Sequence, residues 1–338
     1  MKNNKIVLLT GIAGFIGYHT ALKLLKEGYN VIGIDNINDY YNPKLKIDRL
    51  KELGIQFDYK NHRIVNEKTN LVFYYGDIQD SSLLEEIYQK ENFSGIINLA
   101  AQAGIRYSID KPLAYVDANI TGFVNILELA KNHKISHVVY ASSSSVYGPS
   151  AKQPFSETDP CNNQISIYAA SKKTNESMAG VYAHLYDLQL TGLRFFTVYG
   201  PWGRPDMAPM LFAKAAYEDD TVKIFNYGNQ SRDFTYVDDI VEGLFRVYEK
   251  KEEQLNHNIF NIGNGNPVNL LSFIETLESA SGKTIKKELI AAQPGDVAET
   301  FADITKLSNY IDFKAQIGIA EGIKNFNDWY KSYYHFYN

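Results

Sequence analysis

Cysteine, long apolar runs and excess positive charge are all scarce in this chain of 338 residues. The single cysteine, Cys161, cannot form an internal disulfide, so we expect the protein to work in the reducing cytoplasm. No run reaches the roughly 18 apolar residues that a membrane span requires, so we predict no membrane segment. The net charge of −5, with both signs interspersed, argues against a protein that binds nucleic acid.

The remaining composition is that of an ordinary globular protein. Hydrophobic residues make up 45% of the chain and charged residues 22%. At roughly 150 residues per domain, the length allows two domains or one large one. The seven histidines show no metal-ligand spacing such as H-E-x-x-H, so we predict no metal site.

Short apolar runs alternate with amphipathic stretches over the first 200 residues. We predict strands at 6–9, 31–35, 71–76, 95–100, 137–142 and 190–195, and helices at 16–27, 81–90, 115–132 and 168–186. Strands that are apolar on both faces and alternate with helices form a parallel sheet covered by helices on both sides. The predicted fold class is therefore α/β, with a Rossmann-type doubly wound parallel sheet.

The last part of the chain is less regular. Residues 200–233 contain five prolines or glycines in their first ten positions and are expected to be rich in loops. We predict helices at 236–250 and 270–279 and a strand at 259–262, and we assign no element to the polar stretch 56–70. The predicted Rossmann domain is 1–199, with 234–263 returning to it. Residues 200–233 and 264–338 then form a smaller, mixed α/β substrate-binding lobe.

A glycine-rich turn follows the first predicted strand. Gly11, Gly14 and Gly17 have the spacing G-x-x-G-x-x-G, and the second strand ends in Asp35. In this context the glycines permit a tight turn, close approach of a pyrophosphate and close packing of the helix. The acid can bind the 2′-hydroxyl of the adenosine ribose and repels a 2′-phosphate, which favours NAD over NADP. A plain turn between strand and helix is the alternative.

A tyrosine and a lysine share one face of a predicted helix. Tyr168 and Lys172 are four residues apart, and a nearby cation favours the phenolate, so the tyrosine can take up a proton. A buried tyrosine beside a solvated lysine is the alternative. Tyr40 and Lys44 have the same spacing, but Pro43 lies between them and we expect no helix there. The serine-rich segment 142–148 follows a strand, where ligands bind in such sheets.

These motifs occur in the order and spacing of the extended short-chain dehydrogenase/reductase family, the nucleotide-sugar epimerases and dehydratases, which the chain resembles nearly end to end. Within it, the chain is most similar to the UDP-glucuronate 4-epimerases, through the segments 35–41, 100–108 and 195–207. The resemblance implies that NAD is held by Gly11, Gly14, Phe15, Ile16, Gly17, Asp35, Asn36, Asp77, Ile78, Ala100 and Lys172.

The resemblance also assigns the chemistry. It implies that Tyr168 is the catalytic base, helped by Lys172 and by Ser143 in its proton network. Arg232 and Asp296 would hold the UDP part. The sugar and its carboxylate would be faced by Ser144, Ser145, Thr197 and Arg204.

The activity implied is NAD-dependent epimerisation of a UDP-sugar at C4, from UDP-glucuronate to UDP-galacturonate through a 4-keto sugar. A UDP-glucose/UDP-galactose 4-epimerase is the alternative, against which Arg204 argues. A UDP-glucuronate decarboxylase is disfavoured because serines stand at 144 and 145, where related enzymes carry an acid. A further alternative is a non-catalytic NAD-sensing protein. It is disfavoured because such a protein does not need Ser143, Tyr168 and Lys172 together. The resemblance also implies a homodimer, formed by the helices at 115–132 and 168–186.

Overall fold

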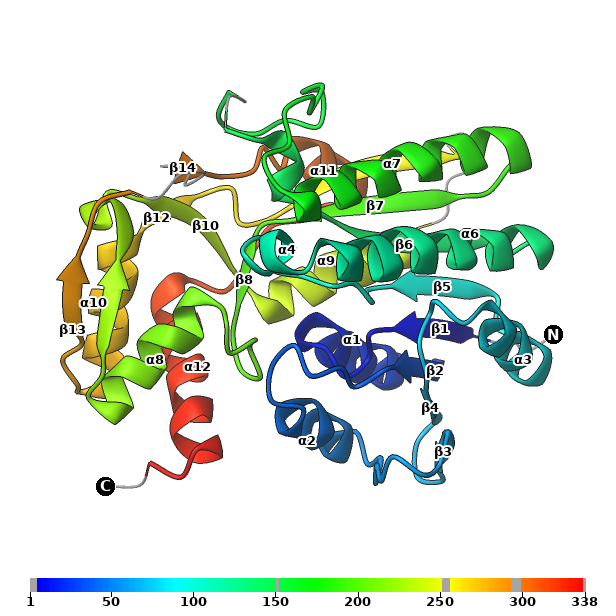
Figure 1. Ribbon diagram of the computed structural model, residues 1–338, viewed down its shortest axis with the longest axis horizontal. Helices are drawn as coiled ribbons and strands as arrows, with labels where there is room; N and C mark the ends of the chain where they lie inside the picture. The colour runs from blue at the N-terminus through cyan, green and yellow to red at the C-terminus, as the bar shows by residue number, and fades with distance from the viewer. Residues whose placement is uncertain (1–4, 150–151, 251–255, 293–298, 337–338) are drawn as a thin grey trace. The chain divides into compact units, whose positions relative to one another are not determined.

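The computed structural model describes residues 5–149, 152–250, 256–292 and 299–336, which fall into two compact units (Figure 1). The first unit comprises residues up to Gly148, Cys161–Arg194 and Val241–Phe260. The second comprises Pro149–Pro160, Phe195–Ile240 and Asn261 onward. No helix in the described residues is long and apolar enough to cross a membrane.

The first unit is built on an eight-stranded sheet, and the predicted α/β fold class is confirmed. The strand order is β11-β7-β6-β5-β1-β2-β4-β3. The pairs that join β1, β2, β4, β5 and β6 are parallel, while β3 is antiparallel to β4. The strands are β1 Ile6–Thr10, β2 Asn30–Asp35, β3 Arg63–Asn66, β4 Leu71–Tyr75, β5 Gly95–Asn98, β6 His137–Ser143, β7 Leu190–Phe195 and β11 His257–Ile262.

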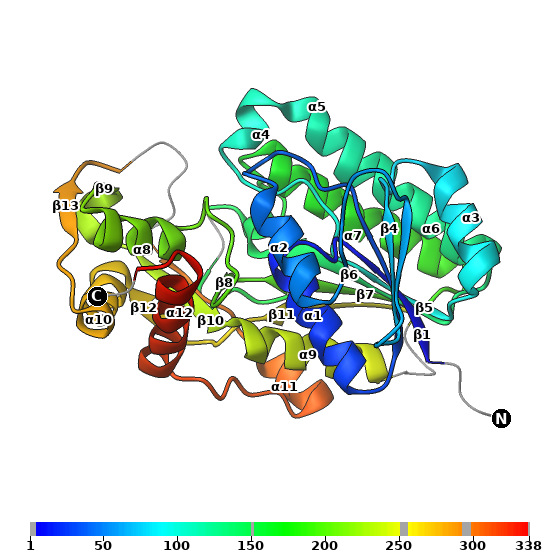
Figure 2. The ribbon, with the colours of Figure 1, turned by 90° about the horizontal axis from the view of Figure 1, so that it is seen from below.

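Helices cover both faces of this sheet. On one face, α3, α6 and α7 bury Ile87, Phe123 and Ala179 in a core with strand residues such as Leu8 and Val138. On the other face lie α1 and α9 (Figure 2). The bounds are α1 Phe15–Lys26, α3 Ser81–Glu91, α6 Gly122–Asn132, α7 Ile167–Tyr186 and α9 Val237–Glu249.

Three segments differ from the sequence-based expectation. The predicted helix 115–132 consists of α5 (Pro112–Tyr115), a π-helix (Val116–Thr121) and α6, preceded by a short α4 (Tyr107–Asp110). Helix α2 (Lys44–Glu52) was not predicted; it begins only at Lys44, with Pro43 as its N-cap, so Tyr40 lies outside it and the pair does not share one helix, as expected. Proline is well tolerated at a helix start. The unassigned stretch 56–70 contains β3, which adds the outer strand of the sheet.

The second unit has its own sheet and core. A four-stranded sheet is formed by β8 Thr197–Tyr199, β10 Ser231–Tyr236, β12 Pro267–Asn269 and β14 Glu299–Thr300. Strands β9 Thr221–Ile224 and β13 Lys286–Leu289 form a parallel pair. The helices are α8 Ala208–Glu218, α10 Leu270–Ser281, α11 Thr305–Ile311 and α12 Ile319–Tyr333. Aromatic side chains such as Phe212, Phe234, Phe273 and Phe326 form its core.

Candidate nucleotide-binding and catalytic site

The glycine turn between β1 and α1 has room only for glycine at critical positions. Gly11 has a φ of +70°, and a Cβ atom there would lie 2.8 Å from the backbone nitrogen of Ala100. A Cβ atom on Gly17 would collide with the carbonyl oxygen of Gly11. Helix α1 has no side-chain cap at Gly14 and no acid in its first turn. Its first N–H groups are thus placed as in a phosphate-binding helix start, at Phe15 and Ile16.

Asp35, at the end of β2, is linked to the glycine turn. Its carboxylate accepts hydrogen bonds from the backbone N–H groups of Ala13 (3.0 Å) and Ile37 (2.9 Å). Its side chain is buried. These contacts place Asp35 at the turn and give it a structural role in addition to the predicted contact with ribose.

The remaining predicted cofactor residues lie at the ends of neighbouring strands. Asn36 follows β2 and donates from Nδ2 to Oδ2 of Asp77 (2.7 Å), which follows β4. Ile78 accepts through its carbonyl oxygen from Asn125 (3.0 Å). Ala100 follows β5. Since β5, β1, β2 and β4 are adjacent in this order, their carboxyl ends meet at one edge of the sheet.

A buried arginine that was not predicted also lies at the turn. Arg49 of α2 is fully buried and donates from Nη1 to the carbonyl oxygen of Ala13 (2.8 Å) and to the hydroxyl of Tyr41 (2.7 Å). It fixes the turn from the side of α2 and adds a positive charge there. No motif indicates this role, because the partner Ala13 is contacted through its backbone.

Helix α7 carries the predicted catalytic pair. It begins after Ser166, whose side chain accepts a hydrogen bond from the N–H of Ala169 (3.1 Å). Lys172 is only 3% exposed, and its Nζ donates to the carbonyl oxygen of Ala141 (2.9 Å). Burial lowers the pKa of Lys172 to about 8. The alternative of a solvated lysine is therefore wrong. Tyr168 is half-buried.

The predicted serines form a hydrogen-bonded turn after β6. The hydroxyl oxygen of Ser143 accepts from the backbone N–H of Ser145 (3.2 Å) and from its hydroxyl (2.9 Å). Ser143 is buried, whereas Ser144 and Ser145 are half-buried at the start of a short 3₁₀ turn, Ser144–Tyr147. The serine side chains thus stabilise the turn on which they are presented.

A buried ion pair that was not predicted supports this turn. Arg194 of β7 donates to both carboxylate oxygens of Glu176 in α7 (2.8 and 2.9 Å), and Ser142 donates to the same carboxylate (2.7 Å). Burial acts to raise the pKa of Glu176, but the hydrogen bonds and charge of Arg194 hold it below its usual value. The Arg194 guanidinium also lies over the ring of Tyr147, 4.7 Å from its centroid. Glu176 lies four residues after Lys172 on the same helix, and this spacing could have indicated in the sequence that Glu176 is buried on the same side of α7 as Lys172.

Asn119 is a second unpredicted centre of hydrogen bonds. It lies in the π-helix and donates from Nδ2 to the hydroxyl oxygen of Ser171 (2.9 Å) and to the carbonyl oxygen of Gln102 (3.0 Å). Its own carbonyl oxygen accepts from Asn175 (2.6 Å). The π-helix therefore connects the segment after β5 to the helix that carries Tyr168.

The predicted residues of the second unit lie on or beside its four-stranded sheet. Thr197 begins β8 and pairs in register with Phe234 of β10. Arg232, also in β10, donates to the side chain of Gln230 (3.1 Å) and to the carbonyl oxygen of Ser231 (2.9 Å). Arg204 lies in the loop after β8. Asp296 lies outside the described residues.

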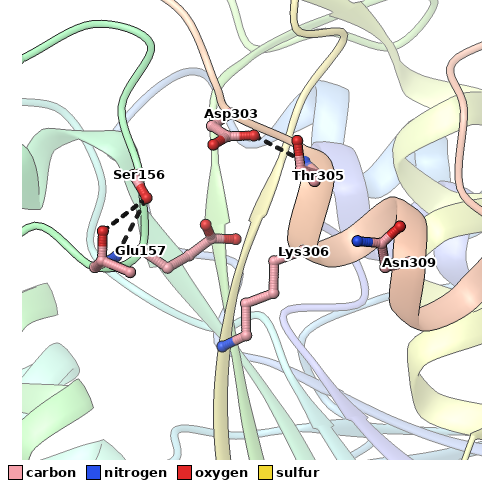
Figure 3. Close-up of a pocket in the computed structure, with 7 residues that line it drawn as sticks. Ser156, Glu157, Asp303, Thr305, Lys306 and Asn309 are labelled. Carbon is pink, nitrogen blue, oxygen red and sulfur yellow. Dashed lines mark hydrogen bonds between the residues drawn. The ribbon is translucent and has the colours of Figure 1, made fainter.

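A pocket of about 350 Å³ in the second unit contains none of the predicted residues (Figure 3). Two of its acids support the fold: Asp303 accepts from the N–H of Thr305 (2.9 Å), and Glu157 accepts from the N–H of Asn261 (2.7 Å). Its lining comprises Ser156, Glu157, Thr158, Asp303, Thr305, Lys306 and Asn309.

The chain is similar along almost its whole length to known proteins. Residues 7–263 match the NAD dependent epimerase/dehydratase family. Protein CapI of Staphylococcus aureus is 47% identical over 97% of this chain and 99% of its own length. UDP-glucuronate 4-epimerase 4 of Arabidopsis thaliana is 42% identical over 98% of this chain and 77% of its own length. The crystal structure of UDP-glucuronic acid 4-epimerase from Bacillus cereus, in complex with UDP-glucuronic acid and NAD, has a TM-score of 0.86 at 33% identity, covering 97% of this chain and 100% of that one.

Proposed function

The chain belongs to the NAD dependent epimerase/dehydratase family, and on this premise we propose that it is an NAD-dependent UDP-glucuronate 4-epimerase. The observation that carries the proposal is the pair on α7, in which Lys172 is buried four residues after Tyr168. A fixed cation beside a phenol suits removal of a proton from a sugar hydroxyl.

NAD fits the glycine turn, because Gly11 and Gly17 let the turn pack closely against Ala100 and against the start of α1, and no side-chain cap or acid occupies that helix start. The residues proposed to hold it are those at the glycine turn and at the ends of β2, β4 and β5, with Lys172. When bound, NAD accepts a hydride from C4 of the sugar and later returns it.

In the proposed mechanism, the phenolic oxygen of Tyr168 takes the proton of the C4 hydroxyl and returns it after the 4-keto sugar has turned over. Lys172 stabilises the phenolate by its charge. Ser143, held by the turn after β6, donates a hydrogen bond to the C4 oxygen. Ser144 and Ser145 supply hydroxyl groups but no acid, which disfavours elimination or decarboxylation as the main reaction.

Arg204 distinguishes the two candidate substrates. We assign to it the C6 carboxylate of UDP-glucuronate, with Thr197 as a hydroxyl donor, while Arg232 and Asp296 are assigned to UDP. A guanidinium has five N–H donors, so Arg204 can bind this carboxylate by charge-assisted hydrogen bonds in addition to the two that it donates to Asp206. A UDP-glucose 4-epimerase has no carboxylate to bind and no need of this arginine.

We further propose a homodimer. Apolar side chains are unusually exposed on α4, α5, the π-helix and α7, where Ile109 and Leu113 are each 73% exposed and Leu185 is 61% exposed. Helices α4 and α5 both contact α7, so these side chains lie on neighbouring helices of the first unit. Val116 and Val181 are exposed as well. Such a patch suits a self-complementary interface with a second copy.

The direct test is to incubate the purified protein with UDP-glucuronate, without added NAD, and to follow the sugar protons by NMR. We expect UDP-galacturonate to appear until an equilibrium mixture is reached. Conversion of UDP-glucose to UDP-galactose instead, with UDP-glucuronate unchanged, would support the alternative and contradict the proposal.

A further inference from the structure

Both tryptophans of the chain meet in the second unit. Trp202 lies in the loop between β8 and α8, and its ring centroid is 5.4 Å from that of Trp329 and 4.9 Å from that of Tyr333, both in α12. Trp202 has a φ of +62°, a left-handed conformation that is costly for a bulky residue and persists where surrounding contacts enforce it. The Nε1 of Trp329 is buried and has no hydrogen-bond acceptor among the described residues, so ring packing carries this contact.

The same loop carries Arg204, two residues after Trp202. The Arg204 guanidinium donates from Nε to Oδ1 of Asp206 (3.1 Å) and from Nη2 to Oδ2 (2.6 Å). Because Asp206 belongs to the same loop, this fork orients the guanidinium relative to the loop. The position of the charged group in the second unit therefore depends on what holds the loop.

Helix α12 is a firm support for the loop. Its residues Ile323 and Phe326 are fully buried in the core of the second unit. Gly322 lies against the ring of Tyr199, with no space for a Cβ atom. Tyr199 is the last residue of β8, immediately before the loop. The loop is thus held by α12 at its start, through Tyr199, and again at Trp202.

We propose that Trp329 and Tyr333 are positioning residues for substrate selection: by holding Trp202 they fix the loop that carries Arg204, and so set the preference for a C6 carboxylate over a C6 hydroxymethyl group. This inference rests on the proposed function, in which Arg204 binds the carboxylate. Neither ring needs to touch the substrate for this role.

The structural half of the inference can be tested by fluorescence. In Trp329→Ala and Trp329→Phe the only tryptophan left is Trp202, so emission excited at the red edge of the absorption band reports on it alone. We expect Trp202 emission to shift to longer wavelength in Trp329→Ala, because the ring becomes more hydrated, and to shift less in Trp329→Phe, which keeps an aromatic contact. Emission that is the same in both variants would overturn the inference.

The functional half is measured on the NAD-loaded protein as the ratio of kcat/KM, or of affinity, for UDP-glucuronate over UDP-glucose. We expect this ratio to fall roughly three- to tenfold in Trp329→Ala and Tyr333→Ala, the size of one aromatic contact. Affinity for UDP alone should not change. The Trp329→Phe variant should recover most of the preference. The matched control is Phe336→Ala, since Phe336 packs on Tyr217 and Tyr330 in the same aromatic cluster.

The outcomes separate the two hypotheses. If the parent protein shows no preference for UDP-glucuronate, the proposed function fails whatever the variants do. If the parent prefers UDP-glucuronate and Trp329→Ala keeps the same ratio despite a shifted Trp202 emission, the proposed function stands and the role of α12 is overturned. An equal loss of preference in Phe336→Ala would also overturn it, because a general loosening of the second unit would then be enough to explain the loss of preference for UDP-glucuronate.

Discussion

Removal of a single oxygen atom, the phenolic oxygen of Tyr168, tests the chemistry most directly. Phenylalanine keeps the ring contact with Tyr115 (centroids 6.1 Å apart) but cannot take up a proton. We expect Tyr168→Phe to keep its fold and bound NAD and to lose at least about a hundredfold in turnover of UDP-glucuronate, the low end for loss of a general base. Thermal midpoint and NAD content serve as controls. Turnover close to that of the parent would contradict the assignment.

Burial of Lys172 predicts a pH dependence of stability. The pKa of Lys172 is lowered by burial from 10.5 to about 8. Between these values the unfolded chain holds a proton that the folded protein does not, so the lysine's contribution to the free energy of unfolding rises with pH. Below pH 8 the cost of burying the cation is present in full. The same burial fixes Lys172 four residues after Tyr168 on α7, so a charge proposed to assist the chemistry costs stability.

We therefore expect Lys172→Met to lose activity. We also expect the stability of the NAD-free variant to depend on pH differently from that of the NAD-free parent. The thermal midpoint of the variant relative to the parent should be highest at neutral pH and should decline as pH rises from 8 towards 10.5. Lys26→Met, at an exposed position of α1, is the matched control and should give a constant difference. Parallel curves for the parent and Lys172→Met would refute the prediction.

Arg204 has a second task if the substrate carries a carboxylate. Oxidation at C4 makes a β-keto acid, which loses CO2 when its C5–C6 bond aligns with the carbonyl π system. A fork of charge-assisted hydrogen bonds holds the carboxylate charged and out of that alignment. We expect Arg204→Ala to weaken the binding of UDP-glucuronate more than that of UDP-glucose. We also expect it to raise the fraction of turnovers that end in a 4-keto-pentose. Mass spectrometry of the products measures the ratio; an unchanged ratio and affinity would place Arg204 outside the pocket.

At the level of elements, the strands of the main sheet could be predicted because each is short, apolar on both faces and followed by an amphipathic helix. The glycine turn and the Tyr168–Lys172 pair could be predicted for a similar reason, since their function depends on spacing within one local segment. Asp35 is found in the same way, as the acid that ends the second strand. The local sequence pattern was therefore sufficient to predict those features whose physical cause lies within one short segment of the chain.

The elements that sequence analysis missed depend on contacts far away in the chain. The π-helix replaces part of a regular helix, and Asn119 within it bonds to Gln102 and to Ser171, 52 residues away. A π-bulge of this kind often marks a functional site. Helix α2 begins at a proline-flanked lysine and is fixed by Arg49, which reaches Ala13. Amphipathic periodicity carries no information about such partners.

The ion pair between α7 and β7 predicts a large stability effect. Both side chains are almost completely buried, so removing Arg194 leaves the Glu176 carboxylate in the interior with only the half-buried Lys173 (3.2 Å) and Ser142 (2.7 Å) as partners among the described residues. We expect Arg194→Met to lower the free energy of unfolding by about 3–5 kcal/mol. The double variant Glu176→Met, Arg194→Met should lose much less free energy of unfolding, since two apolar side chains then pack in place of the ion pair. Denaturant unfolding of the three proteins provides the test, and a double variant as unstable as Arg194→Met would contradict the argument.

At the scale of the whole molecule, the exposed apolar face of the first unit predicts how two copies associate. In a dimer with two-fold symmetry each substituted residue occurs twice, so one charge introduced on the face is buried in both copies. We expect Leu185→Glu to shift the protein from dimer to monomer in light scattering at micromolar concentration, because a buried unpaired charge costs several kcal/mol. Leu211→Glu is the matched control, as Leu211 is a 45% exposed leucine in the second unit. It should leave the dimer intact.

If Leu185→Glu stays dimeric while Leu211→Glu becomes monomeric, the interface lies on the second unit. A monomeric parent would remove the dimer from the proposal altogether. Since Leu185 lies on the same helix as Tyr168, we expect the monomer also to lose part of its turnover, with bound NAD retained, as the end of the catalytic helix loses its support.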